Sequence, residues 1–134
     1  MKPLLIEVLE CIIEAQEASD EAKNGYSNRE DCYKRKAYQI NEVIKLLRCN
    51  YVPEVNYFIS KSKDQNGYSS FITYFDIKLE EKRFQVSFHC PSDKFSFHYL
   101  VGSGRKTRWD KNIGGSRNAC SYLKLMCDSV AYWS

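Results

Sequence analysis

The sequence predicts one α+β domain over residues 1–134, with two N-terminal helices, a four-stranded antiparallel β-meander and a C-terminal helix packed on the sheet. Three observations predict this order. Apolar residues recur at helical spacing up to about residue 48, the period changes to two near residue 55, and helical spacing returns after residue 116. A hydrophobic share of 43% and a charged share of 28% are typical of a globular chain that buries its own core.

The first 50 residues should form two antiparallel helices, over about 4–23 and 28–48. Gly25 is a typical helix end. Ser27, with Glu30 three residues later, makes a capping-box pattern at the start of the second helix.

Residues 57–101 alternate between apolar and polar side chains, which predicts four antiparallel strands with one apolar face. Asn66-Gly67 is a strong turn signal after the first of these strands. The apolar face of the sheet must be covered, and the amphipathic helices can cover it. Ser116 can cap the last helix, expected over about 116–131.

Charge is unevenly distributed along the chain. The formal net charge is +3, but residues 1–25 carry −4 and residues 102–124 carry +5. Such asymmetry suggests a charged partner.

The segment 102–117 is basic and glycine-rich, and we expect it to be irregular. It leads into a helix N-terminus, where backbone N–H groups attract anions, and its tryptophan could stack on a nucleobase. The candidate binding residues are Arg105, Lys106, Arg108, Trp109, Lys111, Ser116 and Arg117. The spacing of its glycines and lysine excludes a phosphate-binding P-loop. The alternative to a binding site is an ordinary solvated surface loop.

His89 and His98 form a candidate catalytic pair. If Cys90 pairs with Phe95 across the intervening turn, the two histidines are diagonal neighbours on the polar face of the sheet. Such a pair could cleave a phosphodiester by acid–base catalysis without a metal. Histidine on an outer strand face is usually only a polar strand residue, and no third ligand at matching spacing indicates a metal site.

A row of glutamates steps by three and four along the first helix: Glu7, Glu10, Glu14, Glu17 and Glu21. Most such rows are solvated faces. The alternative is an acidic surface that engages an arginine-rich groove, as a nucleic-acid mimic does. We expect the basic residues of the second helix, among them Lys34, Arg35 and Lys36, to pair with these glutamates.

The cysteines predict a reducing compartment. None of the six is spaced as C-x-x-C, and the N-terminal apolar run, broken by Glu7 and Glu10, lacks a basic flank and a cleavage site. We therefore expect six free thiols in a cytoplasmic protein. No run is long enough to cross a bilayer, and no motif calls for a cofactor or a metal.

Three short motifs stand out in the second half of the chain: Val-Ser-Phe-His at 86–89, Arg-Trp-Asp at 108–110 and Gly-Gly-Ser-Arg at 114–117. With them, the chain resembles small α+β proteins encoded by phages and mobile elements of low-GC bacteria. Such proteins are frequently inhibitors of host defence, including anti-CRISPR proteins that occlude Cas nucleases. The resemblance implies this class of function and assigns a role to no single residue.

The leading expectation is a non-enzymatic binding protein that acts on nucleic acid or on a nucleoprotein such as a host nuclease. Its specific form, implied by the resemblance, is a phage-type inhibitor of that nuclease. The first alternative is a small metal-independent nuclease or phosphoryl-transfer enzyme that uses His89 and His98. The second is a structural or assembly factor that forms homo-oligomers through its aromatic surface.

Overall fold

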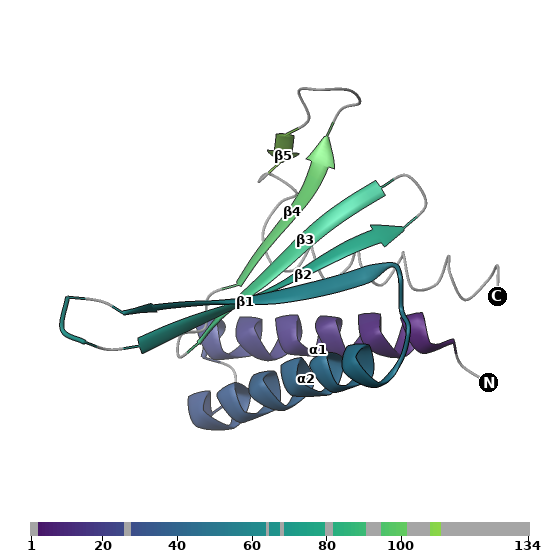
Figure 1. The fold of residues 1–134 in the computed structure, drawn as a ribbon. Coiled ribbons are helices and arrows are strands. Elements are labelled where there is room, and N and C mark those ends of the chain that lie inside the picture. Colours follow the sequence, from purple (N-terminus) through teal and green to yellow (C-terminus); the bar gives the residue numbers. More distant parts are fainter. Residues whose placement is uncertain are drawn as a thin grey trace.

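A computed structural model of the chain describes residues 3–25, 28–63, 65–67, 69–79 and 82–90, together with the backbone of 95–101 and 108–110. Two helices are followed by the strands of one sheet. The elements are α1 (Leu4–Asn24), α2 (Arg29–Cys49), β1 (Val55–Lys63), β2 (Ser69–Leu79), β3 (Lys82–Cys90), β4 (Phe95–Val101) and β5 (Arg108–Asp110). Both helices lie side by side against the same face of the sheet (Figure 1).

The two predicted N-terminal helices are confirmed. Helix α1 ends at Gly25, which adopts the left-handed conformation with φ of 72°. Helix α2 begins after Asn28, whose side-chain oxygen accepts hydrogen bonds from the backbone N–H groups of Glu30 (2.9 Å) and Asp31 (3.3 Å). The prediction that Ser27 caps this helix is therefore wrong. The asparagine oxygen accepts from the N–H of Glu30, the donor expected for Ser27, and also from the N–H of Asp31.

The sheet is an antiparallel meander in the order β1-β2-β3-β4-β5. The β1–β2 ladder runs from Val55 opposite Ile77 to Lys63 opposite Ser69. The predicted Asn66-Gly67 turn lies at its far end, and Gly67 has φ of 83°, a conformation that glycine adopts without strain.

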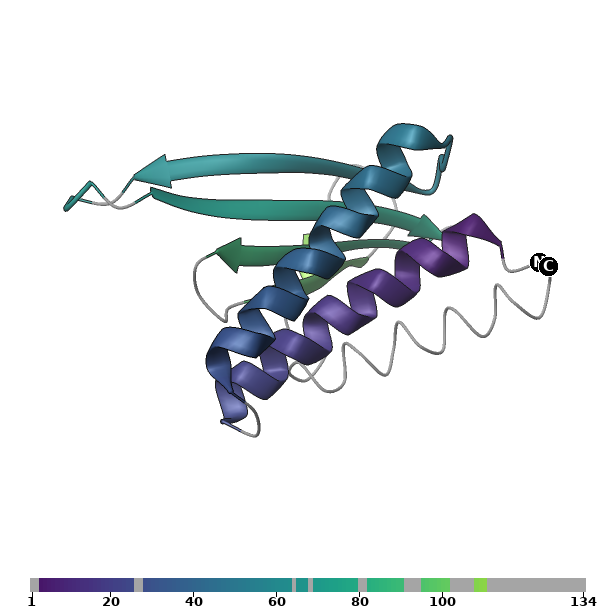
Figure 2. The same ribbon diagram turned by 90° about the horizontal axis from the view of Figure 1, so that it is seen from below.

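One hydrophobic core lies between the helices and the sheet. Val8, Leu9 and Ile12 of α1 are completely buried. The sheet contributes alternate residues of β2 and β3: Phe75, Ile77, Leu79, Phe84, Val86 and Phe88. Burying each such side chain contributes about 1.5–3 kcal/mol relative to leaving it in water. The core therefore fixes which face of the sheet the helices cover, as the view from below also shows (Figure 2).

The predicted four-stranded meander with a C-terminal helix packed on it is contradicted. The residues described with their side chains form two helices and the three-stranded antiparallel sheet β1–β3, and the backbone of β4 and β5 extends that sheet. Strand β5 falls within 102–117, which the pattern predicted to be irregular. A three-residue strand is too short to show the alternation that identifies strands. The described residues include no C-terminal helix, since the predicted one over 116–131 lies outside them.

Candidate nucleic-acid interface

The structure describes the backbone of two candidate residues of the predicted basic segment. Arg108 and Trp109 belong to β5, where they pair with Val101 and Leu100 of β4. Arg108 and Trp109 thus hold successive positions on β5, the last strand in the order of the described sheet. The other candidates lie outside the described residues: Arg105, Lys106, Lys111, Ser116 and Arg117.

The two candidate catalytic histidines are not neighbours. The β3–β4 register pairs Phe95 with Phe88, so the predicted pairing of Phe95 with Cys90 is wrong by two residues. His98 lies opposite Gln85, four positions along β3 from His89, which corresponds to about 13 Å. The last β3–β4 pair is Phe88 with Phe95, and nothing in this register brings the histidines together.

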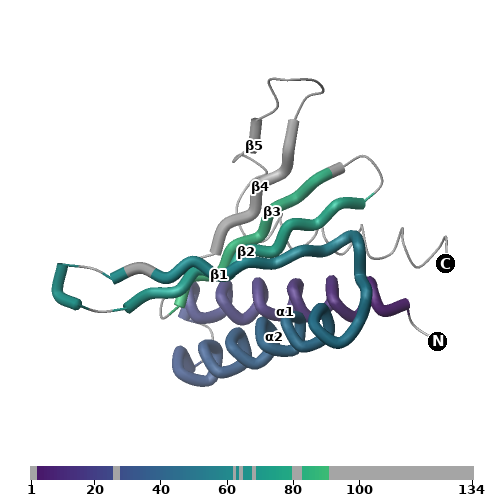
Figure 3. Tube along the Cα trace, viewed as in Figure 1, coloured from purple at the N-terminus to yellow at the C-terminus, as the bar shows by residue number. Residues whose placement is uncertain are grey.

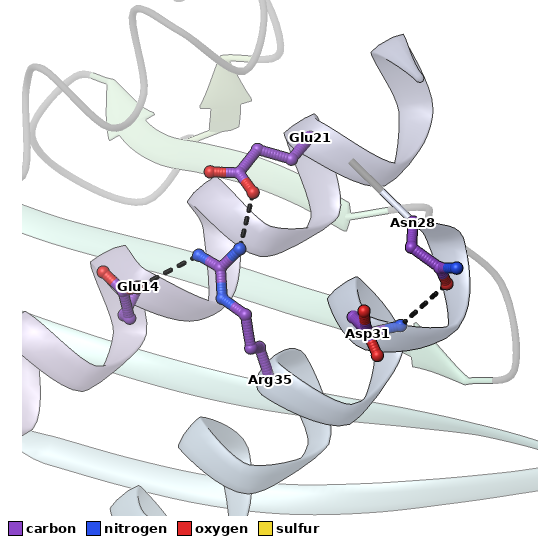
Figure 4. Close-up of polar contacts among 5 residues, drawn as sticks. All are labelled: Glu14, Glu21, Asn28, Asp31 and Arg35. Carbon is purple, nitrogen blue, oxygen red and sulfur yellow. Dashed lines mark hydrogen bonds and ion pairs between the residues drawn. The ribbon is translucent and has the colours of Figure 1, made fainter. Parts of the chain in front are cut away.

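An arginine side chain from α2 pairs with two glutamates of the predicted acidic surface on α1. Arg35 of α2 donates hydrogen bonds to carboxylate oxygens of Glu14 (3.1 Å) and Glu21 (2.5 Å), as Figure 4 shows. The hydrogen bond with Glu21 is the main cause that raises the pKa of Arg35 above its ordinary value, so the guanidinium stays charged. Glu7 and Glu10 are exposed, and Glu17 is half-buried. The row is therefore partly neutralised along its C-terminal half.

Lys34, Arg35 and Lys36 of α2 have three different surroundings. Arg35 pairs with glutamates of α1, as predicted. Lys34 instead forms an exposed ion pair of 3.6 Å with Glu30, one turn earlier on its own helix. Lys36 is only 1% exposed and donates a hydrogen bond to the backbone carbonyl of His89. His89 lies one residue beyond the last β3–β4 pair, so this buried ammonium satisfies a carbonyl at the end of the ladder.

Four cysteines fall within the described residues, and all four are free thiols: Cys11, Cys32, Cys49 and Cys90. Burial, followed by the charge of Glu42, raises the pKa of Cys11, which keeps its thiol protonated. In the part of the chain that the structure describes, no group of three or more His, Cys, Asp or Glu side chains could hold a metal ion. Neither α1 nor α2 is long and apolar enough to cross a membrane.

Among strands β1–β3, the most exposed part is the far end of the β1–β2 hairpin. We call it the distal arm and define it as residues 59–63 of β1, 69–71 of β2 and the turn residues 65–67. It extends past the ends of both helices in two perpendicular views (Figures 1 and 2), and Figure 3 follows its Cα trace out from the sheet. The ladder of β2 with β3 stops at Phe71 opposite Cys90, so the last pairs of the arm form a two-stranded ribbon.

Burial changes along β1 and β2 where the arm begins. Phe75 and Ile77 of β2 are buried under the helices, whereas Phe71 on the same face is 41% exposed. On β1, Ile59 is 45% exposed, and Lys61 beyond it is also exposed. Helix packing therefore ends near the middle of the hairpin, and the arm presents side chains on both faces to solvent.

Two ring contacts order the side chains of the arm and its base. Phe58 and Tyr74, which face each other across β1 and β2, stack with ring centroids 4.4 Å apart and an interplanar angle of 10°. A pair of this kind contributes about 0.5–1.5 kcal/mol beyond its buried area. Further out, the ammonium of Lys61 lies 5.9 Å from the centroid of the Phe71 ring. This cation–π contact orients Lys61 and leaves it exposed.

The sequence contains a pattern that indicates the exposed arm, although the net charge of the segment does not show it. Five residues of β1 lie on the side of the sheet where the helices pack: Val55, Tyr57, Ile59, Lys61 and Lys63. Where lysine replaces an apolar residue on the core-facing side of a strand, the strand has left the core. The net charge there is small, because Asp64 follows the two lysines, so net charge does not distinguish this segment.

Comparison of the chain with protein-family models, with curated proteins and with solved structures finds no match.

Proposed function

We propose that this chain is a non-enzymatic binding protein that acts on nucleic acid or on a nucleoprotein, and that the distal arm is a contact surface. The observation that carries the proposal is the exposure of Lys61 and Lys63 on a projecting ribbon. The ribbon also exposes Ile59 and Phe71. Cations interleaved with aromatic and apolar side chains are typical of surfaces that bind a phosphate backbone and its bases.

The spacing of the two lysines suits a repeating polyanion. Lys61 and Lys63 are two residues apart on one strand, so they occupy the same face about 7 Å from each other. Both can engage one phosphate backbone, and each contact releases condensed counterions. Two contacts supply modest affinity alone, so the arm would act together with further contacts or with a protein component of a nucleoprotein.

Inhibition of a host nucleic-acid-targeting nuclease is the specific form that the resemblance implies. In that form the arm would occupy a surface that the nuclease uses for its own nucleic acid. A cleavage assay with a candidate nuclease, run with and without the chain, tests this form separately from binding.

Binding itself is tested by fluorescence anisotropy with labelled nucleic acids at low salt. The variant Lys61→Gln/Lys63→Gln should bind about tenfold or more weakly, since it loses two phosphate contacts. The matched control is Lys23→Gln/Lys45→Gln, which removes the same charge from exposed helix positions away from the arm. The control should keep most of the wild-type affinity.

Equal weakening by both double variants would show that only net charge matters and would remove the arm from the proposal. Absence of binding by the wild-type chain to any nucleic acid, alone or in a nucleoprotein, would overturn the proposed function. Circular dichroism of each variant establishes that the fold is retained.

A further inference from the structure

The distal arm is a two-stranded antiparallel ribbon that neither α1 nor α2 covers and that β3 does not flank beyond Phe71. Neighbouring strands lie about 4.8 Å apart, so such a ribbon with its side chains is roughly 10–12 Å across. The major groove of B-form DNA is about 12 Å wide and admits a two-stranded ribbon. The major groove of A-form RNA is too narrow for side chains to read.

The side chains of the arm match what a major groove presents. Lys61 and Lys63 are exposed and can reach the phosphates that border the groove. Gln65 is exposed in the turn, and a glutamine amide can bond both the N6 and N7 positions of adenine.

The stacked Phe58 and Tyr74 rings lie where the arm leaves the helix-covered part of the sheet. They hold the base of the two strands together. A ribbon with a fixed base enters a groove with a smaller loss of conformational entropy than a free hairpin does.

We propose that the distal arm inserts into the major groove of B-form duplex DNA, with the tip residues toward the base edges and the lysines toward the phosphates. This inference rests on the proposed function and narrows its ligand to one class. It excludes double-stranded RNA as the preferred ligand, and it gives single strands no groove to fill.

The test compares four labelled probes of equal length and sequence at one low salt concentration. The probes are duplex DNA, duplex RNA, single-stranded DNA, and duplex DNA whose cytosines carry glucosylated 5-hydroxymethyl groups that fill the major groove. Unmodified duplex DNA should bind at least about tenfold more tightly than each of the other three. The variant Lys61→Gln/Lys63→Gln should lose most of that preference, while Lys23→Gln/Lys45→Gln should keep it.

The failures of the two proposals are distinguishable. Equal affinity for glucosylated and unmodified duplexes, or preference for RNA or for a single strand, would overturn insertion into the major groove and leave nucleic-acid binding standing. If the chain binds none of the four probes, insertion into the major groove is overturned. Binding to a nucleoprotein would then be tested separately, by capturing partners with the chain before and after nuclease treatment.

Discussion

Arg35 shows how one side chain joins the two helices. Its guanidinium reaches Glu14 and Glu21, which lie two turns apart on α1, and so fixes how α2 lies along α1. The side chains are 36–42% exposed, so water screens the interaction. Exposed ion pairs contribute about 0.2–1 kcal/mol each, and Arg35 makes two that share one cation.

Replacing Arg35 with Met keeps most of the aliphatic stem and removes the charge. The free energy of unfolding, measured by urea denaturation, should fall by about 1 kcal/mol. In a double-mutant cycle with Glu21→Gln, the second change should cost less once Arg35 is absent. Lys45→Met is the control, at an exposed position of the same helix, and should change stability by no more than about 0.5 kcal/mol. A full additive loss in the cycle would show that the contact contributes nothing.

At the scale of elements, the start of α2 depends on one amide. Asn28 satisfies two backbone donors that the helix itself leaves without an acceptor. Glu30 and Asp31 add negative charge to the first turn, where it interacts favourably with the positive end of the helix dipole. Both features are local, so their contribution can be separated from the core.

Asn28→Ala should lower the free energy of unfolding by about 1 kcal/mol, because it leaves these N–H groups without their side-chain acceptor. Asn41→Ala, in the exposed middle of α2, is the control and should be neutral or slightly stabilising, since alanine has the higher helix propensity. Thermal unfolding followed at 222 nm compares the two. An equal loss from both variants would mean that Asn28 acts only through helix propensity.

The helices and β1–β3 were predictable because their side chains repeat over many residues, as in the alternation of Phe75 and Ile77 on β2. Register was not predictable, because it depends on turn length, and Phe95 pairs with Phe88 instead of Cys90. The capping residue was not predictable either, because the adjacent Ser27 and Asn28 are both good N-cap residues. The predicted basic segment that includes Arg108 stays a prediction, because most of it lies outside the described residues. The distal arm was not predicted, because its exposure depends on where the helices stop.

At the scale of the whole molecule, the order of the strands separates two basic regions. Strand β1, which carries Lys61 and Lys63, is at one edge of the sheet. Strand β5, which begins at Arg108, is at the opposite edge. The two regions can therefore contact a long polyanion at different points, and substitutions in them should act independently.

The variant Arg105→Ala/Lys106→Ala/Arg108→Ala tests the second region. If its residues contact phosphates of duplex DNA, the slope of the logarithm of the binding constant against the logarithm of salt concentration should fall by roughly 0.9 for each lost contact. Combined with Lys61→Gln/Lys63→Gln, the losses in slope should add. An unchanged slope in the triple variant would confine binding to the arm. Charge reversal at Glu10, Glu14 and Glu17 tests the glutamate row separately, as an acidic surface that engages an arginine-rich groove.

The most direct test of the central claim is to locate bound nucleic acid on the fold by NMR. A ¹⁵N-labelled chain would be titrated with the nucleic acid that it binds most tightly, and backbone amide shifts would be followed residue by residue. We expect the largest shift changes within α1, α2 and β1–β3 to fall in the distal arm, at residues 59–63, 65–67 and 69–71. Shift changes concentrated on α1 around Glu7 and Glu10, with the arm unaffected, would contradict it.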